Sequence, residues 1–534
     1  MTNIMSRVDN NKGKVFLVGA GPGDPGLFTL RGVQCLKAAD VVVYDYLASE
    51  ELLAYAGAGA ELIYVGKKGG DHTMQQEDIN RLLVEKGRAG KVVARLKGGD
   101  SFIFGRGGEE ALALREAGVP FEVVPGISSA YAVPAYAGIP VTHRGLTTDV
   151  AFITGHEDPT KAESAIKWDK ISTGVGTLVF LMGVRNLPYI VGRLVANGRP
   201  ATTPVALVRW GSTPRQSTLT GTLANIVDLV KKKGFQAPAI TIVGEVVSLR
   251  GRLRWFEDRP LFGRRVVVTR SRDQASDLAR ALKEAGAQPV EFPTIRVAPP
   301  ADEYVDLDAA VGRIVSENGP AFDWILFTSV NGVDSFFQRL ERQGDVRDLK
   351  GMRLGAIGPA TAAELERRGL KLDFVPSEYR AEAVIEGLLK LGVKGRRVLI
   401  PRAKEAREVL PEQLAAAGAD VEVVAAYETV LERSAANEMK RMLAGGEIDI
   451  ITFTSSSTVR NFVSLLDGLD FASLPAVTVA CIGPVTADTA KGLGLRVDIV
   501  AQKFTIPGLV EALVHWAAAK SNPEQENPKS HSAF

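Results

Sequence analysis

Short apolar runs that each end in a turn recur along the first half of this chain of 534 residues. The run VFLVG leads into a glycine-rich turn at residues 20–26, and VVVY ends at Asp45. Further turns follow such runs at Lys67, Asp100 and Ser128, and apolar residues at helical spacing separate them. This alternation predicts an α/β fold with a mostly parallel sheet, in which the turns converge at the carboxyl ends of the strands.

The turn with the most specific chemistry is RLKGGDSFIFGRGGEE, residues 95–110. Its two adjacent glycines let a ligand lie directly against the main chain, and Asp100 adds two acceptor oxygens. The FIF triplet that follows offers an apolar wall. An ordinary strand-to-helix turn explains the double glycine alone equally well. As a binding site, the turn suits a ligand that is part polar and part apolar.

A dinucleotide-binding site is the rival interpretation of the first turn, because a strand, a glycine-rich turn, a helix and a later acid match that motif. In GAGPGD, residues 19–24, Asp24 replaces the third glycine of the motif and would repel a pyrophosphate. Pro22 removes an N–H group that a phosphate would use. The residues therefore make a dinucleotide the weaker alternative.

The composition argues against several other classes of protein. Basic and acidic residues nearly balance, 64 against 62, so no overall charge favours nucleic acid or an acidic membrane surface. The two cysteines lie far apart and the five histidines lack metal-ligand spacing, so we expect no metal. The first residues are polar, and no apolar run reaches the roughly 18 residues of a membrane span. We therefore expect a cytoplasmic protein.

A charged segment with a proline, residues 251–262, separates this pattern from a second α/β pattern that repeats itself. DWILFTS at residues 323–329 recurs as DIITFTS at 449–455. Such a long repeat indicates two similar α/β lobes rather than a solenoid. We interpret the segment as a linker that few contacts cross, so that cutting the chain after Arg254 should yield two soluble fragments.

Hydroxyl side chains gather at the ends of the repeated strands, after the paired FTS and IGP turns. They are Thr328, Ser329, Thr361, Thr454, Ser455, Ser456, Ser457 and Thr486. Hydroxyl groups and helix N-termini bind carboxylates without a cationic surface. No acid–base or nucleophile–base pair stands out, so these residues alone leave an enzyme and a two-lobed binding module equally open.

The first half resembles the uroporphyrinogen-III C-methyltransferases, which belong to the tetrapyrrole methylase family. The resemblance covers residues 14–250 and rests on GAGPGDPGLFTLRG, DVVVYDYLAS, YVGKKGG, RLKGGDSFIFGRGGEE, VPGISSA, AGIPVTHRG, FLMG and RWGS, in this order. It implies two α/β lobes, about residues 14–130 and 131–250, with S-adenosylmethionine bound between them. The implied cofactor contacts are Pro22, Gly98, Gly99, Asp100, Ile103, Ser128, Ser129, Met182 and Gly211.

The same resemblance implies the catalytic residues of this half, because Asp45 and Lys67 match the family's proposed proton acceptor and proton donor. A carboxylate at Asp45 could stabilise the positive charge that develops on a pyrrole carbon as it is methylated. The family's substrate carries several carboxylates, each of which a nearby cation could bind. The cations expected to do so are Arg95, Lys97, Arg106 and Arg144.

Residues 263–516 resemble uroporphyrinogen-III synthase, a family with two α/β lobes joined by a two-stranded ladder, expected here at residues 292–297 and 424–430. The lobes therefore need not coincide with the sequence repeat. Tyr427 and Thr486 match positions thought to assist the cyclisation of hydroxymethylbilane in that family. The pairs Thr328–Ser329 and Thr454–Ser455 are the expected substrate contacts.

The product of the second family is the substrate of the first, so the sequence predicts a bifunctional tetrapyrrole enzyme. It would cyclise hydroxymethylbilane and methylate the resulting uroporphyrinogen III twice, to precorrin-2. The alternative is another tetrapyrrole methylase fused to a binding module. We also expect an N-terminal tail at residues 1–13, a disordered tail at residues 517–534, and a possible homodimer through the methyltransferase half.

Overall fold

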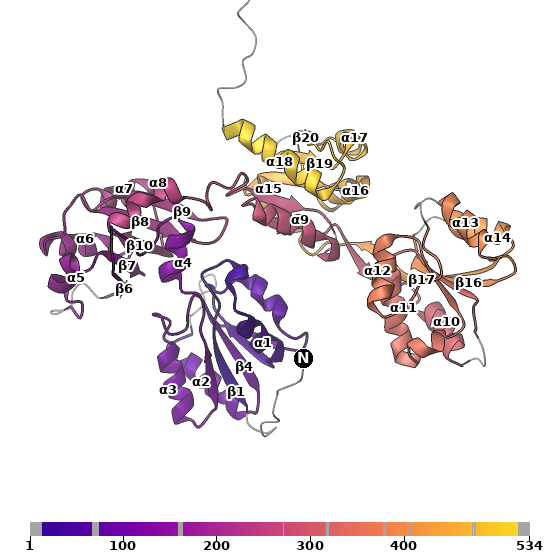
Figure 1. The fold of residues 1–534 in the computed structure, drawn as a ribbon, viewed down its shortest axis with the longest axis horizontal. Coiled ribbons are helices and arrows are strands. Elements are labelled where there is room, and N and C mark those ends of the chain that lie inside the picture. Colours follow the sequence, from indigo (N-terminus) through magenta and orange to yellow (C-terminus); the bar gives the residue numbers. More distant parts are fainter. Residues whose placement is uncertain are drawn as a thin grey trace, which may run out of the picture. The chain divides into compact units, whose positions relative to one another are not determined.

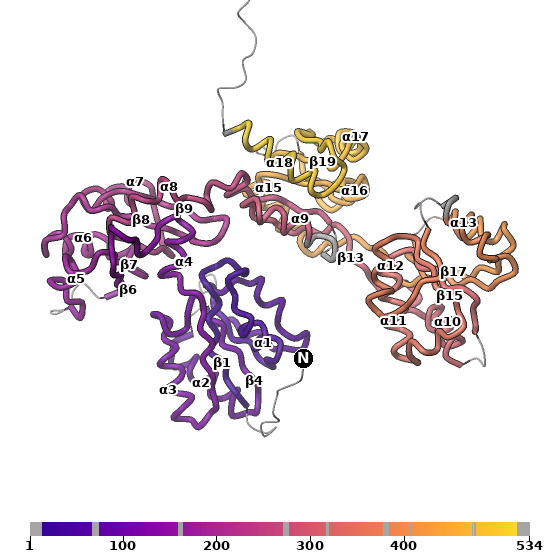
Figure 2. Tube along the Cα trace, in the orientation of Figure 1, coloured from indigo at the N-terminus to yellow at the C-terminus, as the bar shows by residue number. Residues whose placement is uncertain are grey.

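The computed structural model describes residues 13–66, 74–157, 164–270, 272–316, 320–376, 381–405, 408–471, 474 and 477–521 (Figures 1 and 2). The chain divides into two compact units. The first consists of Met1–Arg265, Leu282–Gln288 and Val514–Phe534, and the second of Val266–Ala281 and Pro289–Leu513. Residues 1–12 and 522–534, which hold most of the two predicted tails, lie outside the described residues. The predicted C-terminal tail would begin inside a helix, Ile506–Ser521.

The first lobe of the first unit is a five-stranded parallel sheet in the order β3-β2-β4-β1-β5. Its strands are β1 (Lys14–Gly19), β2 (Val41–Tyr44), β3 (Glu61–Tyr64), β4 (Val92–Lys97) and β5 (Phe121–Val124). Its helices are η1 (Pro25–Leu27), α1 (Leu30–Ala38), η2 (Glu50–Tyr55), α2 (Gln76–Arg88) and α3 (Gly107–Glu116). The strands are apolar on both faces because α1 packs on one face and α2 and α3 pack on the other.

The second lobe of this unit is a mixed sheet in the order β6-β7-β10-β8-β9. Its strands are β6 (Val150–Thr154), β7 (Thr177–Leu181), β8 (Pro204–Arg209), β9 (Ser217–Thr222) and β10 (Ala239–Val243). Its helices are α4 (Ser129–Tyr136), α5 (Trp168–Gly174), α6 (Leu187–Ala196), α7 (Ile226–Lys233), η3 (Glu245–Leu249) and α8 (Arg250–Leu253). The helix α4 covers one face, and α5, α6 and α7 cover the other.

The second unit contains a sheet in the order β12-β11-β18-β19-β20, with parallel pairing from β11 through β20. Its strands are β11 (Arg265–Val268), β12 (Gln288–Glu291), β18 (Ile450–Phe453), β19 (Thr478–Cys481) and β20 (Ile499–Val500). The helices of this lobe are α9 (Arg272–Glu284), α15 (Ala436–Ala444), α16 (Ser456–Leu465), α17 (Pro484–Gly492) and α18 (Ile506–Ser521). The core of the lobe includes Phe292, Phe453 and Phe462.

The other sheet of this unit has the order β13-β17-β16-β14-β15. Its strands are β13 (Ile295–Ala298), β14 (Trp324–Phe327), β15 (Arg353–Ala356), β16 (Arg397–Ala403) and β17 (Asp420–Leu431). Its helices are α10 (Val305–Ser316), α11 (Val330–Gln343), η4 (Val346–Leu349), α12 (Pro359–Arg367), α13 (Ala381–Lys390) and α14 (Val409–Ala416). The long β17 pairs parallel with β16 and then antiparallel with β13, at the place where the sequence predicts a two-stranded ladder.

The two lobes of the second unit differ from the sequence repeat. One sheet takes β11 and β12 from the start of the repeat region and β18 to β20 from its end, whereas β13 to β17 form the other sheet. The second lobe is therefore inserted into the first along the chain. This arrangement agrees with the expectation that lobes and repeat need not coincide.

The segment at residues 251–262 packs closely, which differs from the open linker that its charge suggests. Phe256 is 4% exposed, and its ring meets the ring of Tyr136 edge-on at a centroid distance of 4.8 Å. The Trp255 indole N–H donates to the carbonyl oxygen of Ala135 at 3.0 Å. The backbone N–H of Leu261 donates to the carbonyl of Ala285 at 2.9 Å. The segment contacts the first unit because its aromatic residues bury apolar surface there.

Among the residues that the structure describes, no helix combines the length and the apolar character that a membrane crossing requires.

Candidate functional site

The turns of the first lobe meet at one edge of its sheet, as the sequence predicts, because β1, β2, β4 and β5 run parallel and end there. The turn after β1 and the turn after β4 are joined by two backbone hydrogen bonds. Gly21 N–H donates to Gly99 O at 3.1 Å, and Gly99 N–H donates to Gly21 O at 2.7 Å. Both glycines have positive φ, 79° and 70°, a conformation that favours glycine.

Other glycines allow these turns to approach one another closely. A Cβ atom on Gly126 would lie 2.3 Å from the carbonyl oxygen of Gly99 and 2.7 Å from the Cα of Gly19. A Cβ on Gly98 would lie 2.5 Å from the Cβ of Leu47. The turns after β1, β4 and β5 thus form one interlocked backbone surface that side chains would force apart.

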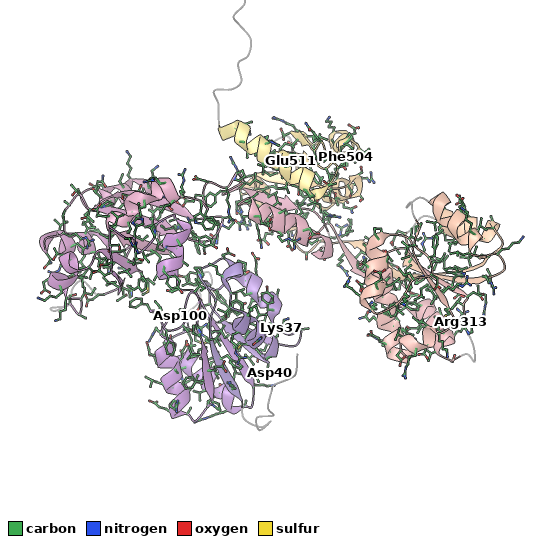
Figure 3. All side chains as sticks on the ribbon, viewed as in Figure 1. Lys37, Asp40, Asp100, Arg313, Phe504 and Glu511 are labelled. Atoms are coloured by element: carbon green, nitrogen blue, oxygen red, sulfur yellow. The ribbon has the colours of Figure 1, made fainter. Side chains whose placement is uncertain are left out.

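Asp100 ties two of these turns together (Figure 3). Its Oδ1 accepts a hydrogen bond from the backbone N–H of Phe102 at 2.8 Å, and its Oδ2 accepts one from Gly126 N–H at 2.9 Å. The three residues of the FIF triplet are 38–53% exposed, with Ile103 at 38%. An exposed apolar triplet therefore lies directly beside a fixed carboxylate, which is the mixed surface that the sequence predicts.

The turn after β1 also contacts the second lobe. The Oγ of Ser212, in the turn after β8, accepts a hydrogen bond from Asp24 N–H at 3.2 Å. A Cβ on Gly23 would lie 2.8 Å from the Cγ2 of Thr213. The Tyr136 hydroxyl donates to Asp24 Oδ2 at 2.7 Å. These contacts join the glycine-rich turn that carries Pro22 to the turn of the second lobe that carries Gly211.

The remaining predicted cofactor contacts lie in turns that follow strands or at the start of a helix. Ser128 caps α4 by accepting from Ala130 N–H at 3.2 Å, and Ser129 is the first residue of that helix. Met182 directly follows β7, has a φ of 58° and is 48% exposed. Gly211 follows β8, where a Cβ would lie 2.4 Å from Val133 Cγ1. Pro22 is half-buried in the turn after β1.

A buried cluster of charges lies behind Asp45. Asp45 Oδ2 accepts from an N–H of Arg95 at 3.1 Å, and Arg95 Nε lies 3.3 Å from Glu110 Oε1. The same oxygen of Glu110 accepts from Lys97 Nζ at 2.7 Å and from Gln76 Nε2 at 3.2 Å. Burial and the charge of Arg95 lower the pKa of Lys97, although Glu110 opposes this. Arg95 is therefore a fixed bridge between Asp45 and Glu110.

This cluster shows that two of the four predicted substrate-binding cations are buried. Arg95 and Lys97 are only 3% and 5% exposed and already have carboxylate partners, which differs from the accessible positions that binding a substrate carboxylate requires. Arg106 and Arg144 are exposed, and Arg106 pairs with Glu109 at 2.7 Å. Lys67, the predicted proton donor, lies outside the described residues.

Sequence reasoning did not identify Glu110, which is fully buried. The helix α3 buries Gly107, Glu110, Ala111 and Leu114, at intervals of three and four residues. That helical spacing was present in the sequence and marks Glu110 as inward-facing. The adjacent Glu109 faces solvent and pairs with Arg106, so the two neighbouring acids have different environments.

In the second unit, Tyr427 and Ser329 lie together. The Tyr427 hydroxyl is 3.0 Å from Ser329 Oγ, which also caps α11 by accepting from Gly332 N–H at 3.1 Å. Tyr427 is 8% exposed and comes from β17, next to the ladder with β13. Thr328 immediately precedes Ser329 at the end of β14. These residues belong to the lobe that contains β13 to β17.

Thr361, in the first turn of α12, belongs to this lobe as well, whereas Thr454, Ser455 and Thr486 belong to the lobe that contains β18 and β19. Ser455 caps α16 by accepting from Thr458 N–H at 3.2 Å, and Thr454 precedes it. Thr486 lies in the first turn of α17 and is 6% exposed. The strands β18 and β19 are parallel neighbours, so both turns lie at the same edge of the sheet. The predicted hydroxyl cluster thus consists of two groups, one in each lobe.

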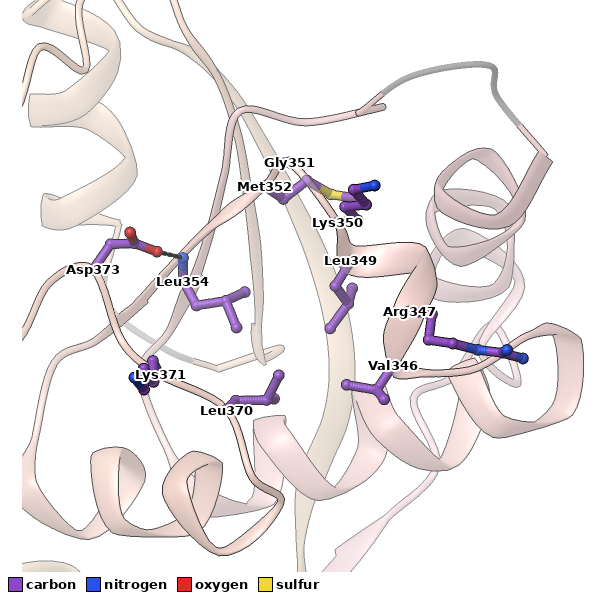
Figure 4. A pocket seen from close by; sticks show the side chains of 10 residues that line it. All are labelled: Val346, Arg347, Leu349, Lys350, Gly351, Met352, Leu354, Leu370, Lys371 and Asp373. Atoms are coloured by element: carbon purple, nitrogen blue, oxygen red, sulfur yellow. Dashed lines mark hydrogen bonds between the residues drawn. The ribbon is translucent and has the colours of Figure 1, made fainter.

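A shallow pocket of about 420 Å³ also lies in the second unit (Figure 4). Apolar side chains such as Leu349 and Leu354 line it, and Asp373 Oδ2 accepts from Leu354 N–H at 2.9 Å. The pocket contains none of the residues singled out by the sequence. Among the described residues, no group of three or more histidine, cysteine, aspartate or glutamate side chains could hold a metal ion.

Two protein families match separate parts of the chain. The family "Tetrapyrrole (Corrin/Porphyrin) Methylases" matches residues 14–227. The family "Uroporphyrinogen-III synthase HemD" matches residues 276–511. The two matches fall on either side of the packed segment at residues 251–262.

Individual relatives extend these matches. The porphyrin biosynthesis protein HemD of Ruminiclostridium josui is 39% identical over 504 residues, which cover 94% of this chain and 98% of that protein. An S-adenosyl-L-methionine-dependent uroporphyrinogen III methyltransferase of Methanosarcina barkeri is 52% identical over 242 residues, covering 45% of this chain and 95% of the relative. A crystal structure of the uroporphyrin-III C-methyltransferase of Thermus thermophilus with S-adenosyl homocysteine is 43% identical, with a TM-score of 0.38, and covers 44% of this chain and 100% of that one.

Both matches occur in one chain, and similarity to the R. josui protein continues across the junction between them. The fold agrees, because a two-lobed α/β unit with interlocked glycine turns precedes a unit of two α/β lobes, one of them inserted into the other along the chain. The chain therefore belongs to the family of fused enzymes in which a uroporphyrinogen-III C-methyltransferase of the tetrapyrrole methylase type precedes a uroporphyrinogen-III synthase.

Proposed function

We propose that the second half cyclises hydroxymethylbilane to uroporphyrinogen III and that the first half methylates this product twice, to precorrin-2. The observation that carries the proposal is the presence of both families in one chain, because the product of one reaction is the substrate of the other. A relative that shares nearly the full length of the chain supports the view that the two halves work together.

S-adenosylmethionine is the methyl donor of the first half. When bound, it supplies a methyl group on a positively charged sulfur. The proposed contacts fit such a molecule, because glycine at 98 and 211 lets the turns pack closely against Leu47 and Val133, and the Cβ position of Gly99 is open to within 3.7 Å. Ile103 offers an exposed apolar surface, and Asp100 holds the backbone beside it in place. Positioning is the main task of such a site.

The other proposed cofactor contacts lie in the turn after β1 (Pro22), at the start of α4 (Ser128 and Ser129) and directly after β7 (Met182). We propose that Asp45 stabilises the positive charge on the pyrrole ring during methyl transfer and accepts a proton afterwards. Arg95 fixes the Asp45 carboxylate at 3.1 Å, which supports a precise orientation. Lys67 stays the proposed proton donor. Exposed Arg106 and Arg144 are the proposed partners of substrate carboxylates.

In the second half, we propose that hydroxyl groups and helix N-termini bind the carboxylates of the linear substrate. The proposed contacts are Thr328, Ser329, Thr454 and Ser455, with Tyr427 and Thr486 assisting the cyclisation. The hydrogen bond between Tyr427 and Ser329 supports a shared role for these two residues. A cytoplasmic location and a homodimer through the first half remain predictions.

The proposed function predicts the products of the purified protein. With hydroxymethylbilane and S-adenosylmethionine, it should form a cyclic product that carries two added methyl groups, as measured by mass spectrometry. Without the methyl donor, the reaction should stop at uroporphyrinogen III. A methylated linear substrate, or no cyclisation in either assay, would instead favour a methylase fused to a binding module.

A second prediction concerns Asp100. The substitution Asp100→Ala removes two hydrogen bonds to backbone N–H groups and should raise the Kd for S-adenosylhomocysteine roughly 10- to 100-fold, since a hydrogen bond to a charged group contributes about 1.5–3 kcal/mol. Calorimetry measures the affinity. Cyclisation by the second half should not change.

Asp40→Ala is the matched control for this measurement (Figure 3). Asp40 Oδ2 also accepts a hydrogen bond from a backbone N–H, that of Val92 at 2.8 Å. This bond lies at the amino ends of β2 and β4, whereas Asp100 lies at the carboxyl ends of the strands. Cofactor affinity in this variant should stay near the wild-type value. Equal losses in both variants would show that Asp100 acts through general stability, and no loss in Asp100→Ala would remove it from the proposed pocket.

A further inference from the structure

Glu257 belongs to the segment at residues 251–262, yet it is held by three side chains of the first unit. Its Oε1 accepts from Gln216 Nε2 at 2.7 Å and from Thr218 Oγ1 at 2.6 Å. Its Oε2 pairs with Arg250. The side chain is 13% exposed, so these interactions are largely sheltered from water. A carboxylate with this many partners is a fixed part of the structure.

Gln216 connects Glu257 to the turn after β8. While its Nε2 donates to Glu257, its Oε1 accepts a hydrogen bond from Ser212 N–H at 2.9 Å. Ser212 in turn accepts from Asp24 N–H through its Oγ. Gln216 and Ser212 are 5% and 2% exposed. A continuous chain of hydrogen bonds therefore runs from Glu257 to the first glycine-rich turn.

The turn that Gln216 holds has a strained backbone. Trp210 and Ser212, on either side of Gly211, have φ angles of 49° and 64°, in the left-handed region that side chains disfavour. Such a conformation persists only where the surroundings fix it. Gln216 supplies a fixing contact here, and its Nε2 is held by Glu257 at 2.7 Å and, at the longer distance of 3.2 Å, by the carbonyl oxygen of Tyr136.

Aromatic residues of the same segment support the turn from a second side. The Tyr136 ring lies 5.1 Å from Trp255 and 4.8 Å from Phe256, both in edge-on contact. Its hydroxyl donates to Asp24, and burial together with this hydrogen bond raises the pKa of Tyr136. The hydroxyl therefore stays protonated and remains a donor at neutral pH.

We propose that Glu257 is a positioning residue of the methyltransferase half: through Gln216 and Ser212 it fixes the turn that carries Gly211 against the glycine-rich turn of the other lobe. The segment that the sequence presents as a linker is therefore part of the architecture of the cofactor pocket. This inference rests on the proposed place of the cofactor at Gly211 and the interlocked turns.

The test measures S-adenosylhomocysteine affinity by calorimetry on the full-length protein. Glu257→Ala should raise the Kd about tenfold, equivalent to about 1.4 kcal/mol. Gln216→Met keeps the side-chain volume but breaks the connection to Ser212, and should have a similar effect. With saturating cofactor, kcat should stay within about twofold of wild type, because a positioning contact for the cofactor pocket acts mainly on binding.

Two variants serve as matched controls. Thr218→Val removes a hydrogen bond to the same Glu257 oxygen, but one that does not lead to Ser212. Asp258→Asn alters the neighbouring acid, which pairs with Arg254 at the surface at 2.6 Å. Both should keep the wild-type Kd. Glu257→Gln, which retains an oxygen acceptor for Gln216, should recover most of the affinity lost in Glu257→Ala.

The possible results separate this inference from the proposed function. A wild-type protein that does not bind S-adenosylhomocysteine contradicts the proposed function itself. Wild-type binding with an unchanged Kd in Glu257→Ala and Gln216→Met overturns the role of Glu257. Equal losses in Gln216→Met and Thr218→Val overturn it as well, because the effect would then not depend on Ser212. If Glu257→Ala does not fold, the comparison of Gln216→Met with Thr218→Val decides.

Discussion

Replacing Glu110 by alanine should lower the free energy of unfolding of the methyltransferase half by about 3–5 kcal/mol, the usual cost of breaking a buried ion pair by removing one partner. Glu110 is fully buried, and one of its oxygens accepts from both Arg95 and Lys97. Without it, Arg95 keeps its ion pair with Asp45, whereas Lys97 loses its ion-pair partner among the described residues. Thermal or urea unfolding of the full chain should show an earlier first transition.

Glu109→Ala provides a closely matched control, because Glu109 is the preceding residue of the same helix and pairs at the surface with Arg106. An exposed pair of this kind contributes little, so we expect a change below about 1 kcal/mol. Cyclisation by the second half should be unaffected in both variants. A Glu110→Ala protein as stable as Glu109→Ala would mean that the buried cations have other compensation.

The stability deficit of Glu110→Ala should also depend on pH. Burial and the charge of Arg95 already lower the pKa of Lys97 below 10.5, and Glu110 raises it, so removing Glu110 lowers it further. Between that lowered pKa and 10.5 the unfolded state binds more protons than the folded state, so stability rises with pH. The difference between wild type and Glu110→Ala should therefore shrink as the pH rises towards 10.5.

A cut before Trp255 should damage the first half, whereas a cut after the packed segment should separate the two halves intact. A first fragment that ends at Arg254 lacks Trp255, Phe256 and Glu257, and should be insoluble or fail to bind S-adenosylhomocysteine. Phe256 is 4% exposed, and removing a buried phenylalanine side chain alone costs about 3–5 kcal/mol. A fragment that ends at Gly263 keeps these residues and should bind the cofactor.

Circular dichroism and calorimetry on the two N-terminal fragments measure this difference. The fragment that begins at Arg264 should still cyclise hydroxymethylbilane, although it loses the hydrogen bond between Leu261 and Ala285. Equal solubility and equal affinity in both N-terminal fragments would show that the aromatic residues of the segment are dispensable. The packing therefore shifts the expected cut position from Arg254 to Gly263, nine residues later.

The architecture of the sheets could be predicted from the sequence because parallel strands that are covered on both faces read as continuous apolar runs. VFLVG and VVVY are such runs, and their turns do share one edge. Gly21, Gly99 and Asp100 could also be singled out, because glycine and an acid at a strand end are local signals. In the second half, the repeated FTS and IGP turns predicted one cluster of hydroxyl residues at strand ends, whereas the structure divides these residues between the two lobes.

Partnerships between distant residues could not be predicted. Arg95 and Lys97 read as accessible cations, because the sequence does not show that Glu110 on a later helix compensates their charge inside the lobe. Glu257 lies among charged residues that are typical of a linker. Its role depends on Gln216, whose position is fixed by the turn after β8 rather than by any local pattern.

The interrupted sheet of the second unit has a consequence for the order of folding during synthesis. The Thr452 hydroxyl donates to the carbonyl of Val267, 185 positions earlier, at 2.7 Å. While the ribosome produces the chain, β11 can pair with β12 but has no partner on its other side until β18 emerges, whereas β13 to β17 can already pair among themselves. The lobe that contains β13 to β17 is therefore the first of the two to be complete, and one side of the apolar β11 stays without a partner until β18 has been translated.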